Sequence, residues 1–279
     1  MGGVGTAPVP WRTDEGMTDR LRVAWLTTGR GPGSYGALEY AFAAIQDGLP
    51  VEVAVVFVNR EPGEGEPTDR LLGLVRANGV PLETLSSIAF RKARGGKLSR
   101  PGEPLPAWRR EFDVEVARRL GRYSFDLGVM FGYMLIATEP LFGRFTFIND
   151  HPALPDGPIG TYQEVIRELM GGGARESGCM WNVVTGDVDR GPAVSFCRYP
   201  IFDEQSRPLW LSYISTRNRR PPLPPDETLL YQEIRRRGVE RERPFMVETL
   251  RAIAEGRLAV PPAEPVDLTE AVERAVGRR

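Results

Sequence analysis

The sequence of 279 residues contains few of the side chains that metal sites and disulfide scaffolds need. It has one histidine, His151, and two cysteines, Cys179 and Cys197. A metal site built from several histidines is therefore excluded, and two thiols in so long a chain indicate a reducing compartment. No apolar run reaches the roughly 18 residues of a transmembrane helix, and the N-terminus lacks the apolar core of a signal peptide. We expect a cytoplasmic protein without a membrane partner or a metal.

The chain also lacks an excess of charge of either sign. The formal net charge is −1, so nothing favours nucleic acid as a partner. Lys92 and Lys97 are the only lysines, and arginine supplies the other basic residues, a bias too general to mark one site. Hydrophobic residues make up 41% of the chain, enough for one large α/β domain with an appendage or for two small domains.

Short apolar runs alternate with amphipathic segments over the first half of the chain. This order predicts an α/β fold with a mostly parallel, twisted sheet and helices on both faces. The expected strands are 22–27, 51–58, 126–131 and 146–149, and the expected helices are 34–46, 68–78, 108–120 and 161–170. Residues 87–106, rich in Arg, Gly and Pro, indicate a loop, and helix 108–120 is expected to turn its Glu and Arg outward.

The second half of the chain follows another pattern. Two strands, 177–184 and 193–199, predict an antiparallel hairpin at 177–199 that places Cys179 roughly opposite Cys197. We favour two packed thiols over a disulfide. Further helices are expected at 227–237, 243–255 and 268–276.

A first candidate site lies around the single histidine. Asn149 and His151 end an apolar run, at the strand end where open α/β sheets bind ligands. Asp189 lies in a glycine-flanked loop that could fold back over the same edge. An amide can donate to a developing oxyanion, and a carboxylate beside an imidazole favours its charged form.

A second candidate site is the glycine-rich turn Gly31-Pro32-Gly33-Ser34-Tyr35-Gly36, which follows a strand and opens a helix. Glycines at a helix N-terminus let backbone amides approach an anion, and Ser34 is placed to cap the helix. The turn also matches the GxGxxG pattern of dinucleotide sites. No acidic residue ends the second strand, so NADP through Arg60 stays open, as does a turn without a ligand.

At these residues the chain resembles the folate-dependent formyltransferases, and among them the phosphoribosylglycinamide formyltransferases. The resemblance covers about residues 21–200 and 243–258. The matching segments are Asn149-x-His151-Pro152, Asp187-x-Asp189-x-Gly191-Pro192, Gly132-Tyr133-Met134, Gly31-x-Gly33-Ser34, Val58-Asn59-Arg60 and 254–258. The chain departs from the family at Leu135, where a basic residue is common, at Asn182, where a histidine is usual, and at 152–158. It also adds about twenty residues near 205–238.

The resemblance implies a Rossmann-like formyltransferase fold and formyl transfer from 10-formyltetrahydrofolate to a primary amine. It implies catalysis by Asn149, His151 and Asp189. The implied folate-binding residues are Met134, Leu135, Ala137, Gly186 and Asp187, and the implied phosphate-binding residues are Gly31, Gly33, Ser34 and Tyr35. The leading acceptor is glycinamide ribonucleotide, of purine biosynthesis. Another amine such as an amino sugar nucleotide, hydrolysis of the donor, an NADP-dependent oxidoreductase and a non-catalytic folate-binding protein are the alternatives.

The expected organisation has four parts. They are a disordered leader at 1–20, a formyltransferase catalytic domain at 21–204, a C-terminal helical extension at 205–260 on the same domain, and a tail at 261–279. A homodimer is left open.

Overall fold

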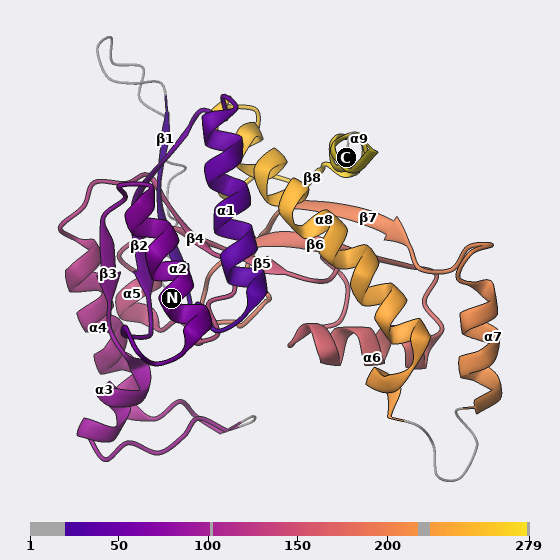
Figure 1. Ribbon diagram of the computed structural model, residues 1–279, viewed down its shortest axis with the longest axis horizontal. Coiled ribbons are helices and arrows are strands. Elements are labelled where there is room, and N and C mark those ends of the chain that lie inside the picture. Colours follow the sequence, from indigo (N-terminus) through magenta and orange to yellow (C-terminus); the bar gives the residue numbers. More distant parts are fainter. Residues whose placement is uncertain (1–19, 101–102, 217–223, 278–279) are drawn as a thin grey trace, which may run out of the picture. The chain divides into compact units, whose positions relative to one another are not determined.

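The computed structural model describes residues 20–100, 103–216 and 224–277 (Figure 1). These residues form two compact units that are discontinuous in sequence. Unit 1 contains the described residues up to Asn149, together with 183–191 and 251–260, and unit 2 contains the remainder. The expected leader lies outside the described residues, apart from Arg20. No helix in the described part of the chain is long and apolar enough to cross a membrane.

Unit 1 is built on parallel strands in the order β3-β2-β1-β4-β5. The predicted strands are present, and the parallel pairing confirms the predicted α/β class. The bounds are β1 (Leu21–Thr27), β2 (Val51–Val58), β3 (Leu82–Thr84), β4 (Leu127–Met130) and β5 (Phe147–His151, of which the last two residues belong to unit 2). The short edge strand β3 was not predicted, because three residues are too few to show a period.

Helices cover both faces of this sheet. The bounds are α1 (Pro32–Gln46), α2 (Glu66–Ala77), α3 (Ser87–Ala93), α4 (Ala107–Leu120) and α5 (Glu139–Phe142). On one face, Leu26 of β1 packs in a core cluster with Phe112 of α4. On the other face, a Cβ built on Gly29 would meet both Val58 of β2 and Leu71 of α2. Because successive strand side chains alternate between faces, both layers are apolar and buried.

Two predictions about where the helices of unit 1 begin were wrong. Helix α1 begins at Pro32 with Gly31 as its N-cap, so Ser34 lies inside the first turn and does not cap it. Proline is favoured at a first helical position, which explains the earlier start. The segment expected to be a loop contains α3, whose N-cap Ser86 accepts a hydrogen bond from the Ala89 amide at 3.0 Å.

Unit 2 contains the predicted hairpin. Strand β6 pairs antiparallel with β7, and Cys179 lies directly opposite Cys197, both free and buried. Strand β7 also pairs in parallel with β8. The bounds are β6 (Glu176–Val183, of which Val183 belongs to unit 1), β7 (Ala193–Pro200), β8 (Val266–Asp267), α6 (Tyr162–Gly172), α7 (Arg207–Thr216), the 3-10 turn η1 (Pro225–Glu227), α8 (Leu229–Ala254, whose last four residues belong to unit 1) and α9 (Thr269–Gly277).

The two helices expected at 227–237 and 243–255 are one continuous helix, α8, with Pro244 inside it. Proline removes one helical hydrogen bond and usually kinks or ends a helix. Here the residues that follow it, Phe245 and Met246, are fully buried, and this apolar burial favours continuation. Residues 261–279, expected as a tail with a helix at 268–276, contain that helix as α9, and they also contain β8, which was not predicted. Val272 of α9 is fully buried, so the segment is packed and not a surface tail.

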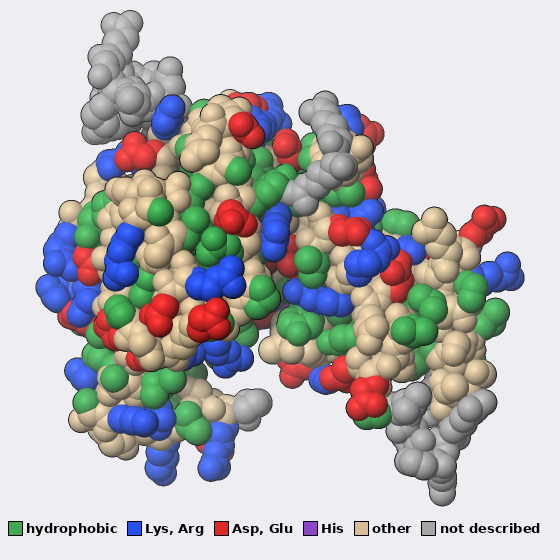
Figure 2. All heavy atoms as spheres, viewed as in Figure 1, with side chains coloured by type: hydrophobic (Ala, Val, Ile, Leu, Met, Phe, Trp, Pro, Cys, Tyr) green, Lys and Arg blue, Asp and Glu red, His purple; other side chains and the backbone are tan. Residues whose placement is uncertain are grey.

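Acidic and basic side chains are interspersed on the face of each unit that Figure 2 shows, without a broad patch of one sign. No histidine is visible on this face, in keeping with the 2% exposure of His151.

Candidate active site

The carboxyl ends of β1 and β4 meet where the strand order of unit 1 reverses. Strand β1 has β2 on one side and β4 on the other, and ligands of open α/β sheets bind at such a reversal. The Thr28 amide donates to the Gly132 carbonyl oxygen at 3.0 Å, and the Met134 amide donates to Thr28 Oγ1 at 2.9 Å. Gly132 has φ +65°, and a Cβ there would lie 2.8 Å from Ser34 Oγ. Glycine at 132 therefore lets the segment after β4 approach the glycine-rich turn.

Asn149 and Asp189 come together at the same edge of unit 1. Asn149 Nδ2 donates to Asp189 Oδ1 at 3.3 Å, and both side chains are half-buried. The loop that carries Asp189 returns to β5, since the Val184 amide donates to the Phe147 carbonyl at 2.8 Å. Asp189 has φ 55°, a left-handed conformation that aspartate tolerates better than most residues. The fold thus joins two polar groups that are 40 residues apart.

The loop also depends on a glycine. A Cβ on Gly191 would lie 1.8 Å from the Val183 carbonyl oxygen, so no other residue fits there without movement of the backbone. At the exposed tip, Thr185 Oγ1 accepts from the Asp187 amide at 3.2 Å. Gly186 and Asp187, the expected folate contacts of this loop, are both exposed to solvent.

His151 belongs to unit 2, two residues along β5 from Asn149. Its ring is buried, and Nε2 lies 2.9 Å from the carbonyl oxygen of Pro158. A carbonyl only accepts hydrogen bonds, so Nε2 carries the hydrogen and donates it. This bond fixes the orientation of the ring.

The glycine-rich turn has the geometry expected of an anion site. Gly31 caps α1 without a side-chain hydrogen bond, and Pro32 occupies the first turn. A Cβ on Gly31 or Gly33 would meet no atom within 4 Å, so packing does not explain these glycines. Ser34 is buried, and Tyr35 stacks beneath Arg70, whose guanidinium lies 5.2 Å from the ring centroid. The helix N-terminus supplies amide donors and positive potential.

The polar side chains at the end of β2 form hydrogen bonds and an ion pair with neighbouring segments of the chain. Arg60 donates to the Glu64 carbonyl at 2.5 Å and pairs with the Glu64 carboxylate at 3.6 Å. Asn59 Nδ2 donates to Ser87 Oγ at 3.2 Å. Arg60, on which an NADP site would depend, therefore stabilises its own loop.

The segment 134–138 combines exposed and buried side chains. Met134 is 61% exposed, whereas Leu135 is half-buried and Ala137 is buried, and both pack against the core cluster of unit 1. The carbonyl of Ile136 accepts a hydrogen bond from Arg109 Nη2 at 2.6 Å. Arg109 was not identified as a site residue from the sequence, and its expected outward direction was wrong, because it is 1% exposed. The signal that could have identified it is its spacing of four residues from Asp113, which allows an ion pair on one helix face.

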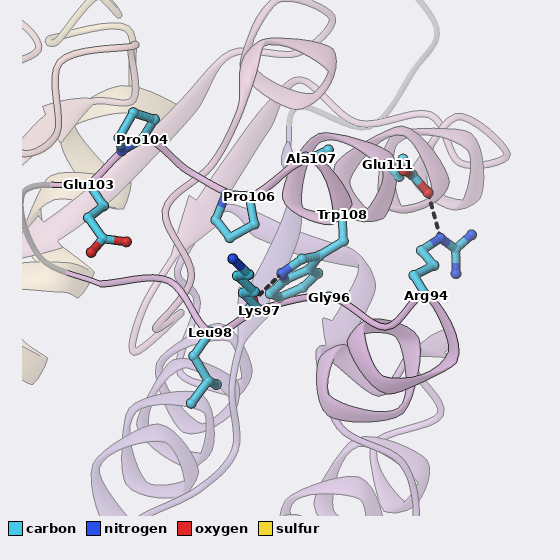
Figure 3. Close-up of a pocket in the computed structure, with 10 residues that line it drawn as sticks. All are labelled: Arg94, Gly96, Lys97, Leu98, Glu103, Pro104, Pro106, Ala107, Trp108 and Glu111. Carbon is cyan, nitrogen blue, oxygen red and sulfur yellow. Dashed lines mark hydrogen bonds and ion pairs between the residues drawn. The ribbon is translucent and has the colours of Figure 1, made fainter.

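A cavity of about 350 Å³ lies at the start of α4 (Figure 3). Trp108 projects into it and donates through Nε1 to the Lys97 carbonyl at 2.8 Å, and Arg94 pairs with Glu111 at 2.6 Å. None of the site residues predicted from the sequence lines this cavity. Among the described residues, no group of three His, Cys, Asp or Glu side chains could hold a metal ion.

The doubly wound sheet, with polar groups at its carboxyl edge, defines a Rossmann-like α/β protein, a class of fold whose ligands generally bind at the strand ends. Residues 22–209 match the formyl transferase family. The chain therefore belongs to that family, which confirms the resemblance to folate-dependent formyltransferases inferred from the sequence.

Solved structures show the same fold. A glycinamide ribonucleotide transformylase from Symbiobacterium toebii is 24% identical with a TM-score of 0.62, covering 90% of this chain and 94% of that one. A phosphoribosylglycinamide formyltransferase from Coxiella burnetii is 20% identical (TM-score 0.58; 86% and 90% covered). A formyltetrahydrofolate deformylase from Pseudomonas syringae is 17% identical (TM-score 0.58; 85% and 62% covered). No curated protein sequence matches the chain.

Proposed function

We propose that the protein transfers the formyl group of 10-formyltetrahydrofolate to a primary amine. The observation that carries the proposal is the contact of Asn149 with Asp189 at the carboxyl edge of the sheet, in a chain of the formyl transferase family. The amine nitrogen attacks the formyl carbon, and the carbonyl oxygen becomes an oxyanion. When the tetrahedral intermediate collapses, the bond from carbon to the folate nitrogen breaks and the formylated amine leaves.

Asn149 serves as an oxyanion donor in this mechanism. Its amide carries two N–H bonds, so one can hold Asp189 while the other points to the developing charge. His151 is the second stabilising group, with Nε2 fixed on Pro158 so that a protonated Nδ1 can donate to the oxyanion. Asp189 moves the proton from the amine to the departing folate nitrogen through an ordered water.

The folate donor is proposed to bind through the two loops at the edge of unit 1. Met134, Leu135 and Ala137 form the first loop, and Gly186 and Asp187 lie at the exposed tip of the second. Backbone amides and carbonyls would bind the pterin, which is rich in donors and acceptors. Leu135 stands where a basic residue is common in the family, so the chain lacks that cation for the tail of the donor.

The acceptor is proposed to carry a phosphate, as glycinamide ribonucleotide does, bound at Gly31, Gly33, Ser34 and Tyr35. The open space above both glycines and the helix N-terminus support this choice. Such an acceptor would place the protein in purine biosynthesis. Another phosphorylated amine, such as an amino sugar nucleotide, would use the same turn.

The test is turnover of 10-formyltetrahydrofolate by the purified full chain with no acceptor, with glycinamide ribonucleotide, or with an amino sugar nucleotide. Formation of tetrahydrofolate together with a formylated amine supports the proposal and identifies the acceptor class. Release of formate without an acceptor would show that the protein hydrolyses the donor and does not transfer its formyl group. Consumption of NADPH without folate turnover, or folate binding without turnover, would refute the proposal.

A further inference from the structure

A buried ion pair on α4 contacts the segment that the proposed function assigns to the donor. Arg109 is 1% exposed and Asp113 is fully buried, with Arg109 Nη2 lying 3.6 Å from Asp113 Oδ1. Arg109 Nη2 also donates to the carbonyl of Ile136 at 2.6 Å. Asp113 Oδ2 accepts from both the amide and the hydroxyl of Thr138, at 2.6 Å and 2.8 Å. The two charges therefore hold the backbone on either side of Ala137.

The segment needs such contacts, because it belongs to no helix or strand. It follows β4 and precedes α5, and its first amide is held by Thr28 Oγ1. Met134 and Ile136 are 61% and 42% exposed, so apolar burial, which Leu135 and Ala137 supply, fixes only alternate residues of this segment. The hydrogen bonds to α4 hold the carbonyl at 136 and the amide at 138 in a defined direction.

Packing alone would not favour charged groups at this position. Removing two charges from water is costly, and a buried ion pair is often no more stabilising than apolar residues of similar volume. Three buried polar atoms of this cluster have no hydrogen-bond partner among the described residues: Arg109 Nη1, the Tyr133 hydroxyl and Asp113 Oδ1, which lies at ion-pair distance only. Burial raises the pKa of Asp113, and the Arg109 guanidinium opposes that rise. A cluster with unsatisfied groups is better explained by directional contacts than by stability.

We propose that Arg109 and Asp113 are positioning residues that set the affinity for the folate donor by fixing the backbone of residues 134–138. The inference rests on the proposed function, since that function assigns the segment to the donor. Neither side chain touches the reacting atoms. The pair therefore controls donor binding, while the acceptor site at the glycine-rich turn and the chemistry at Asn149 keep their own geometry.

The experiment compares Arg109→Met with the matched control Arg118→Met. Arg118 lies on the same helix and forms an ion pair with Glu115 at 2.7 Å, but its side chain is 62% exposed. Binding of a stable 10-formyl folate analogue, 10-formyl-5,8-dideazafolate, is measured by equilibrium titration, and hydrogen exchange is followed over 134–138. Arg109→Met should bind the analogue about tenfold or more weakly, as expected for loss of a charged hydrogen bond. Its KM for the acceptor and its kcat at saturating donor should stay within about twofold of wild type.

Hydrogen exchange at 134–138 should accelerate in Arg109→Met and remain unchanged in Arg118→Met. A folded Arg109→Met protein with wild-type donor affinity would overturn the inference, as would equal losses for donor and acceptor. Thr138→Val keeps the backbone contact and removes only the hydroxyl contact to Asp113, so it tests the same point if Arg109→Met does not fold. It should weaken donor binding by a few-fold (roughly 1 kcal/mol), and unchanged affinity would refute the inference. Wild type that fails to bind the analogue would instead refute the proposed function.

Discussion

Replacing Asn149 by alanine tests the proposed chemistry most directly. In the structure its Nδ2 is 3.3 Å from Asp189 Oδ1, and the second N–H of the same amide remains for the oxyanion. Loss of one oxyanion donor costs about 2.7–4 kcal/mol of transition-state stabilisation, which corresponds to a kcat lower by roughly a hundredfold to a thousandfold. Both side chains are half-buried, so the lost Asn149–Asp189 hydrogen bond should lower the free energy of unfolding by only about 1 kcal/mol.

The assay is single-turnover formyl transfer at saturating donor and acceptor, together with a thermal unfolding curve for each variant. Asn78→Ala is the matched control, because Asn78 also donates through Nδ2, to the Leu74 carbonyl at 2.9 Å, but at the end of α2. It should leave kcat unchanged. If the folded Asn149→Ala protein loses less than about tenfold in kcat, Asn149 does not stabilise the oxyanion by about 2.7–4 kcal/mol, and its role as oxyanion donor is refuted.

Three further predictions concern other parts of the chain. His151→Ala should lower kcat by roughly a hundredfold or more, as expected for loss of an oxyanion donor, and turnover at the wild-type rate would contradict the role of the only histidine. Gly33→Ala should fold normally, since its Cβ meets nothing within 4 Å, but should raise KM for a phosphorylated acceptor about tenfold (roughly 1.4 kcal/mol) while leaving donor KM unchanged. A hydrogen bond from Arg236 lowers the pKa of Glu233 from 4.5 to about 2. Glu233→Gln should therefore lower the free energy of unfolding by about 1–2 kcal/mol at pH 7, and this difference from wild type should shrink as the pH falls from 4.5 to 2. Unfolding curves that show the same difference at pH 7 and at pH 2 would contradict this prediction.

Several features could be predicted from local sequence because local periodicity encodes them. The continuous β-branched run at 51–58 and the alternation of strands with helices predict a parallel sheet, and β2 has those bounds. The two strands around residues 185–192 predict the hairpin, and its register places Cys179 opposite Cys197. The motif ending at Asn149 and the loop carrying Asp189 were also recognised, and the structure brings these two residues together.

The sequence by itself thus determined the fold class, the hairpin and the family of this protein, because hydrophobic periodicity and short motifs are carried by residues that are close in the sequence. Only the tertiary structure decided which way Arg109 points, because that depends on the Ile136 carbonyl, 27 residues away. It also decided that α8 continues through Pro244, since burial of Phe245 and Met246 opposes the local tendency to break. In both cases a long-range contact outweighs the preference of the local segment.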